Sequence, residues 1–84
     1  MSKIKKNLAA LLEGRSDENF DFSDLCFILG RAGFTLRRGK GSHQIYFKEG
    51  VEEIINLQPR GSQAKAYQVK QVRDLIIKYQ LEID

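Results

Sequence analysis

The order of secondary structure is clearest in residues 34–58, FTLRRGKGSHQIYFKEGVEEIINLQ. Three runs in this stretch, 34–38, 42–49 and 53–58, are rich in β-branched and aromatic residues. Short glycine-containing turns separate them. Runs of this composition and spacing predict a three-stranded antiparallel meander.

Helical spacing of apolar residues appears on both sides of these strands. A first helix over residues 3–13 is predicted from the stripe Ile4, Leu8, Leu11 and Leu12. A second helix, capped by Asp21 or Ser23 and ending at Gly33, carries the stripe Leu25, Ile28, Leu29 and Ala32. A third begins at Ala66 and carries the stripe Val69, Val72, Ile76 and Tyr79.

This order of elements predicts a two-layer α+β fold. Because the strands are consecutive and joined by short turns, the helices must stack on one face of the sheet. The opposite face, where Arg, Lys and Gln are expected to alternate outward, then stays available for a ligand. We expect a single domain over residues 1–84, made of an N-terminal helical extension (1–18) and a core (19–84).

Length and composition exclude several classes of protein. With 84 residues there is no room for a catalytic domain plus a separate binding domain. No apolar run approaches the ~18–20 residues that span a bilayer, so a soluble, cytoplasmic protein without a membrane partner is expected. Cys26 is the only cysteine and His43 the only histidine. They cannot form an internal disulfide or a zinc set, so we expect no metal and no cofactor, and Cys26 is expected to pack as a small buried residue.

The charge of the chain is unevenly distributed. The net charge is only +3, but residues 31–48 and 60–73 contain no acidic residue, whereas acids dominate residues 13–24. The cations of the two acid-free segments are Arg31, Arg37, Arg38, Lys40, Lys48, Arg60, Lys65, Lys70 and Arg73. Two positive segments on one small chain favour a polyanion partner, nucleic acid first, although they are also compatible with ordinary solvated surface charge.

Residues 37–43, RRGKGSH, are the densest concentration of functional side chains. Cleavage of RNA by its own 2′-hydroxyl needs a base that works near neutral pH, and positive charge for the developing phosphorane. His43 is the candidate base, with Arg38 or Lys40 supplying charge. A structural interpretation is also open, because strand alternation places His43 on the same face as Ile45 and Phe47, where a histidine is usually packed.

Three further features have two interpretations each. The loop 61–65 could hold a phosphate at the start of the last helix, with Lys65 adding charge, but a loop that caps the helix is the plainer reading. Tyr46 and Tyr67 could stack on bases or simply pack, and the sequence does not distinguish these roles.

The residues from Asp24 to Leu81 resemble the HicA toxin family. The resemblance lies in the motifs LGRAGF (29–34), GSHQIY (41–46), INLQP (55–59) and YQVKQVR (67–73). It implies a small mRNA interferase with a double-stranded-RNA-binding-like fold of one helix, three strands and one helix, to which the helix at 3–13 is an addition. It also implies catalysis by His43 without a metal and inhibition by a HicB antitoxin.

One departure from the family pattern follows the third strand. Many members have a second histidine there, but this chain has Pro59-Arg60, and an arginine carries charge without exchanging a proton at neutral pH. The leading hypothesis is an mRNA endoribonuclease that binds RNA through Arg37, Arg38, Lys40, Gly41, Ser42, Lys65 and Lys70. A non-catalytic module that binds double-stranded RNA and a protein-interaction domain are the alternatives.

Overall fold

The computed structural model describes residues 3–14, 16–39, 41 and 43–83, without the side chain of Lys3. Within these residues the chain forms three α-helices, one 3₁₀ turn and three strands. In chain order they are α1 (Lys3–Glu13), η1 (Asp17–Asn19), α2 (Phe22–Arg31), β1 (Thr35–Arg38), β2 (Gln44–Lys48), β3 (Val51–Leu57) and α3 (Ala66–Lys78). The predicted order of elements is confirmed.

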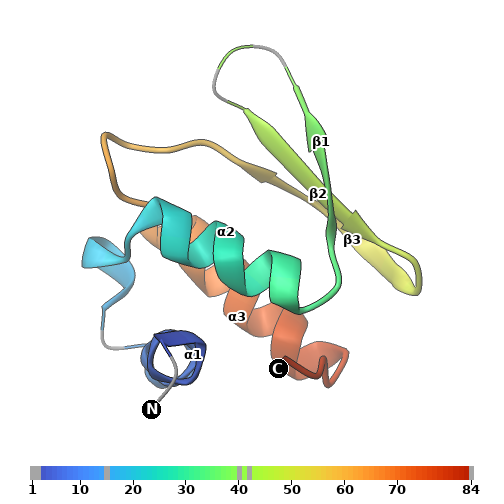
Figure 1. Cartoon of the computed structure of the whole chain (residues 1–84), viewed down its shortest axis with the longest axis horizontal. Coiled ribbons are helices and arrows are strands. Elements are labelled where there is room, and N and C mark those ends of the chain that lie inside the picture. The colour runs from blue at the N-terminus through green and yellow to red at the C-terminus, as the bar shows by residue number, and fades with distance from the viewer. Residues whose placement is uncertain (1–2, 15, 40, 42, 84) are drawn as a thin grey trace.

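The strands form one antiparallel sheet in the order β1-β2-β3. Helices α2 and α3 lie side by side on one face of it, and α1 lies beside them at one end (Figure 1). The expected two-layer α+β fold with an additional N-terminal helix is therefore confirmed. The β2–β3 register shifts between Tyr46 and Lys48, away from the end of β2 that begins beside His43.

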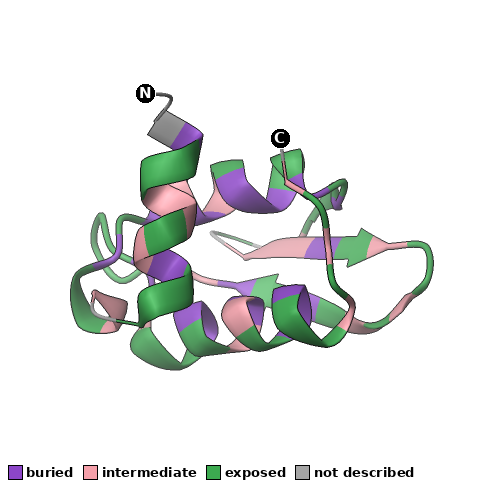
Figure 2. Cartoon of the chain, turned by 90° about the horizontal axis from the view of Figure 1, so that it is seen from below, coloured by how far each residue is buried: buried purple, intermediate pink, exposed green. Residues whose placement is uncertain are grey.

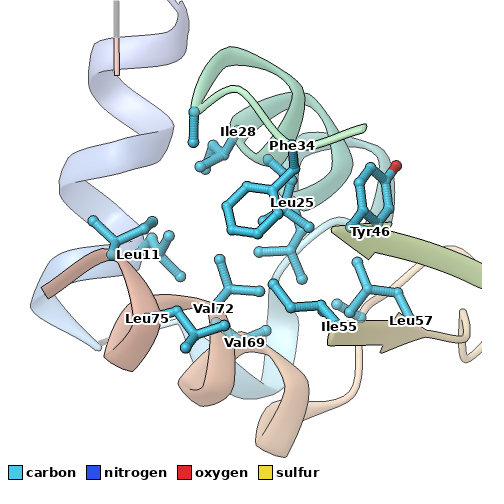
Figure 3. Close-up of a cluster of buried hydrophobic side chains, with 14 of the residues drawn as sticks. Leu11, Leu25, Ile28, Phe34, Tyr46, Ile55, Leu57, Val69, Val72 and Leu75 are labelled. Atoms are coloured by element: carbon cyan, nitrogen blue, oxygen red, sulfur yellow. The ribbon is translucent and has the colours of Figure 1, made fainter. Parts of the chain in front are cut away.

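The core lies between the helices and the sheet, and every α-helix contributes to it (Figure 3). The predicted stripes of α2 and α3 are buried as expected, apart from Tyr79, which is half-buried. In α1, Leu11 is fully buried, but Leu12 is 43% exposed, so placing Leu12 on the buried face was wrong. The reason is that α1 packs at the end of the helical layer and contacts its neighbours along a narrow stripe only.

The two ends of α2 show why it spans these residues. The carboxylate of Asp21 accepts hydrogen bonds from the backbone N–H groups of Ser23 and Asp24, at 2.9 and 3.2 Å, which makes Asp21 the N-cap. At the other end Gly33 has a φ of +96°, a conformation that L side chains rarely adopt. The chain leaves the helix there and enters β1.

The burial pattern of β2 identifies the face that the helices cover. Tyr46 is buried, Gln44 contacts Cys26 of α2, and Lys48 reaches Gly33 at the end of α2. These residues therefore face the helices, contrary to the expectation that Lys and Gln line the open face. Strand alternation then leaves His43, Ile45 and Phe47 on the open face.

Buried residues line the inward sides of the helices and strands, and exposed residues lie outward (Figure 2). Among the described residues no helix combines the length and apolar character needed to cross a membrane.

Candidate active site

His43 lies just before β2, at the end of the β1–β2 hairpin that extends beyond the helices (Figure 1). The backbone N–H of Gly39 donates to the carbonyl of His43 at 3.1 Å, which closes the hairpin around three residues. Gly41, inside that loop, has a φ of +65°. His43 is half-buried on the open face of the sheet, together with Ile45 and Phe47, and is not one of the buried core residues.

The imidazole of His43 is held by β3. Its Nδ1 lies 3.2 Å from Oδ1 of Asn56. An amide oxygen only accepts hydrogen bonds, so Nδ1 of the neutral ring carries the proton and Nε2 carries the lone pair. Among the described residues no hydrogen bond to Nε2 is found. The geometry therefore orients a ring that can accept a proton at Nε2.

Asn56 is in turn held by a residue of α3. The Gln68 side chain is only 2% exposed, and its amide nitrogen donates to the backbone carbonyl of Asn56 at 2.9 Å. Its amide oxygen accepts from the N–H of Gln58 at 3.4 Å. The Gln68 side chain thus hydrogen-bonds to the backbone at this end of β3 as a neighbouring strand would. It also connects α3 to the site of His43.

The space beside His43 depends on Gly39. A Cβ at this position would lie 3.3 Å from the Cβ of His43 and 3.4 Å from the Cδ1 of Ile45. The contact with His43 would be tighter than most real Cβ contacts, so a side chain at position 39 would require His43 to shift by a few tenths of an ångström.

The two arginines of β1 lie on opposite faces of the sheet. Arg37 pairs with Ile45 and therefore shares the open face with His43. Arg38 pairs with Gln44, and its charge acts on Tyr46 from the side of the helices. Both side chains are exposed, but only Arg37 is directed to the face of the imidazole. Arg37 and His43 are diagonal neighbours across the β1–β2 pair, and diagonal neighbours in a sheet typically have Cα atoms about 7–8 Å apart.

The remaining predicted binding residues are dispersed. Lys65 is the N-cap of α3, so loop 61–65 does cap this helix, but the cap is the Lys65 backbone carbonyl and involves no side-chain hydrogen bond. Lys70, one turn further on, lies 4.0 Å from Asp74, and this exposed pair contributes little to stability. Lys40 and Ser42 lie outside the described residues.

The helix-facing side of β2 carries a second polar group, which is not positioned for catalysis. The Tyr46 hydroxyl donates to Oε1 of Gln44 at 3.1 Å, and the Cys26 thiol lies 3.5 Å from the same oxygen. Burial raises the pKa of both the Tyr46 phenol and the Cys26 thiol, which keeps both groups protonated. Tyr46 therefore packs, whereas Tyr67 is 65% exposed.

Asn56 and Gln68 were not among the predicted site residues, although each carried a signal. Asn56 alternates with the buried Ile55 and Leu57, which places it on the open face. Gln68 lies one turn before Val72 on the buried stripe of α3, and a buried polar residue usually has specific partners.

Comparison with known families gives one match. A family model described as the HicA toxin of bacterial toxin-antitoxin systems matches residues 22–79. The chain belongs to the HicA toxin family. As a HicA toxin it is one half of a toxin-antitoxin partnership. Comparison with curated proteins and with solved structures found no match.

The HicA match begins at the first residue of α2 and ends just after α3. It includes His43, Asn56 and Gln68, while α1 and η1 lie before it. Among the described residues of this HicA chain, no group of three or more His, Cys, Asp or Glu side chains gathers into a cation site.

Proposed function

We propose that this HicA toxin is an endoribonuclease that cleaves mRNA without a metal ion, with His43 as the general base. The hydrogen bond between Nδ1 of His43 and Oδ1 of Asn56 is the observation that carries the proposal. It leaves the lone pair on Nε2 of an imidazole that lies on the open face of the sheet. A base held in this tautomer can take a proton from a ribose 2′-hydroxyl.

The reaction would proceed as an internal transfer. Nε2 of His43 removes the 2′-hydroxyl proton, and the 2′-oxygen forms a bond to the adjacent phosphorus. The bond from phosphorus to the 5′-oxygen breaks, and that oxygen takes a proton from a water molecule, whose remaining hydroxide takes the proton held on Nε2 of His43. The products are a 2′,3′-cyclic phosphate and a 5′-hydroxyl. Arg37, on the same face, would stabilise the charge that develops on the phosphoryl oxygens.

RNA binding would be largely electrostatic. Arg37 would contact the RNA on the face of His43, the backbone at Gly41 would contact it in the β1–β2 loop, and Lys65 would contact it at the start of α3. Arg38 and Lys70 would add charge at the periphery, and Lys40 and Ser42 of the same motif stay sequence predictions. Because these are mainly phosphate contacts, affinity should fall steeply with added salt.

We also propose a HicB-like antitoxin as the partner in the cytoplasm. A toxin that works from one imidazole on an open face is silenced most directly by covering that imidazole. The open face beside His43 also exposes apolar side chains, of which Phe47 is 42% and Ile54 63% exposed. Exposed apolar groups on the same face as a catalytic residue suit a protein partner that excludes RNA.

The test is cleavage of a labelled, structured RNA in EDTA. We expect the wild-type protein to cut the RNA and His43→Ala to lose about 10²–10⁴-fold in rate, the usual contribution of a general base. Gel electrophoresis follows the cleavage, and circular dichroism checks that the variant is folded. Intact RNA in both lanes would contradict the proposal and favour a module that binds RNA without cutting it.

Asn56→Ala is the graded control in the same assay. It removes the acceptor for Nδ1 but leaves the imidazole in place, so we expect a loss of about three- to tenfold in kcat with an unchanged KM. A loss as large as that of His43→Ala, or a change in KM alone, would contradict a positioning role for Asn56.

A further inference from the structure

A cleft outside the candidate active site lies between η1 and the segment that enters α3. It has a volume of about 870 Å³. Its lining includes Glu18, Asn19, Arg60, Gln63, Lys65 and Tyr67. Neither His43 nor Asn56 lines it.

The segment that forms one wall of the cleft is held by backbone hydrogen bonds. Arg60 and Gln63 exchange both of their backbone hydrogen bonds, at 2.7 and 3.1 Å, across a tight turn. The N–H of Phe22 donates to the carbonyl of Ser62 at 3.0 Å, and the N–H of Ala64 donates to the carbonyl of Phe20 at 2.8 Å. The connection before α3 is therefore fixed to the connection before α2, and the cleft is preformed.

The opposite wall is η1, which Arg73 of α3 holds in place. The Arg73 guanidinium donates to both carboxylate oxygens of Asp17, at 2.9 and 3.1 Å, and to the carbonyl of Leu11 at 3.2 Å. This ion pair fixes the position of η1, and the positive charge of Arg73 compensates the negative charge of Asp17. Glu18 is then the one acidic group among the lining residues, against the cations of Arg60 and Lys65.

The lining combines the groups that recognise a nucleotide. Two cations suit a phosphate, and the ring of Tyr67, which is 65% exposed, is a surface on which a base can stack. The side chains of Asn19 and Glu18 offer a donor and acceptors for the edge of a base. Duplex RNA keeps its bases stacked inside, so this combination suits a single strand.

The cleft is connected to the active site through hydrogen bonds. The Gln68 amide nitrogen that donates to the Asn56 carbonyl also donates to the Tyr67 hydroxyl, at 3.5 Å. Asn56 in turn holds His43. The Tyr67 hydroxyl at the cleft and Asn56, which holds His43, are thus joined through one side chain, that of Gln68.

We propose that this cleft binds one nucleotide of single-stranded RNA, whose base stacks on Tyr67 while its phosphates contact Arg60 and Lys65. The proposal rests on the ribonuclease function proposed above and adds a subsite to it. Glu18 and Asn19 precede the segment matched by the family model, so one wall of the subsite comes from residues outside that segment. Base preference at this subsite should therefore change with Asn19.

The chain contains no Trp, so a single introduced Trp can report on base stacking. The reporter is Tyr67→Trp, and the matched control is Ile77→Trp, which lies on the same helix with a similar exposure of 60%. Both carry His43→Ala, which keeps the RNA uncut. The probe is a short unstructured RNA. We expect saturable fluorescence quenching at position 67 and none at position 77.

Binding strength gives the second readout. Tyr67→Ala in the His43→Ala background should bind the same RNA roughly tenfold or more weakly by fluorescence anisotropy. The reason is that loss of one base–aromatic stacking contact typically lowers affinity by about that factor. Equal affinity, equal quenching at both positions, or quenching by a perfectly paired duplex as strong as by the single strand would each overturn the proposal.

The two proposals can fail separately. If wild-type protein cleaves RNA and Tyr67→Ala cleaves it with the same KM, the subsite is refuted and the ribonuclease stands. If wild-type protein cuts no RNA but quenching at position 67 persists, the subsite stands and the ribonuclease is refuted.

Discussion

At the scale of single residues, Arg37 and Arg38 show that one step along a strand moves a side chain to the opposite face of the sheet. They are consecutive, equally charged and both exposed, yet β1 directs Arg37 to the face of His43 and Arg38 to the side of the helices. The sequence alone suggests the same role for both. Their positions favour Arg37 as the residue that meets the scissile phosphate.

The expected result is a difference between Arg37→Ala and Arg38→Ala. Arg37→Ala should weaken RNA binding and lower the slope of log affinity against log salt by about 1, the signature of one lost phosphate contact. Arg38→Ala is the matched control and should change both quantities less. Anisotropy titrations at several salt concentrations measure this, and equal losses for the two variants would contradict the assignment.

The residues that hold His43 could be predicted only in part. The imidazole itself stands out in the sequence, because it is the chain's only histidine and follows a cationic, glycine-rich segment. The two residues that position it do not stand out. Asn56 is 13 residues further along the chain, and Gln68 hydrogen-bonds to the backbone of Asn56 from another element. Hydrogen-bond partners of this kind are set by the packing of α3 against β3.

At the scale of elements, α2 contains one glycine that its structure does not require. Gly30 is exposed within the helix, and a Cβ there would meet no atom within 4 Å apart from its immediate surroundings in the helix. Glycine in a helix costs free energy relative to alanine because it loses more backbone entropy on folding. Gly33, at the end of the same helix, differs because its φ is +96°.

Gly30→Ala should therefore stabilise the protein by about 0.5–1 kcal/mol and raise Tm by about 2–8 °C. Gly33→Ala is the control and should destabilise it by about 1–2 kcal/mol, mainly through the positive φ. The new Cβ would also lie 2.6 Å from Nζ of Lys48, but that side chain can move away. Thermal unfolding measures both, and changes of the same sign would contradict this explanation.

The elements themselves were largely predictable. Local patterns predict the three strands, the three helices and the cap at Asp21. Each segment shows its own alternation or helical periodicity of apolar residues. One exception is Leu12, which continues the apolar stripe but is 43% exposed. Another is loop 61–65, whose backbone hydrogen bonds to Phe20 and Phe22 no local pattern predicts.

At the scale of the whole molecule, one interaction joins β3 to the end of α3. Glu53 accepts hydrogen bonds from Nζ of Lys78 at 2.8 Å and from the hydroxyl of Tyr79 at 2.5 Å. Chiefly the bond from Lys78, and then that from Tyr79, lower the pKa of Glu53 from its ordinary 4.5 to about 2. A carboxylate whose pKa falls on folding stabilises the folded state while it is ionised.

This contribution should be present in full above about pH 4.5 and be lost as the pH falls through about 2. Glu53→Gln should thus lower the urea midpoint at pH 7, and the difference from wild type should shrink on acidification. Glu52→Gln removes the same charge at the adjacent position and controls for net charge. A difference between Glu53→Gln and wild type that stays constant from pH 7 to about pH 2 would contradict this account.

The element order, the antiparallel meander, the buried stripes and the membership of the HicA family could all be inferred from the amino-acid sequence. Each depends on residues close together in the chain, and local periodicity or a short motif is enough to reveal them. The orientation of His43, its bond to Asn56 and the cleft between η1 and Arg60–Tyr67 required the folded chain. They depend on which face of the sheet the helices cover and on contacts between distant segments, and no local pattern encodes those distances.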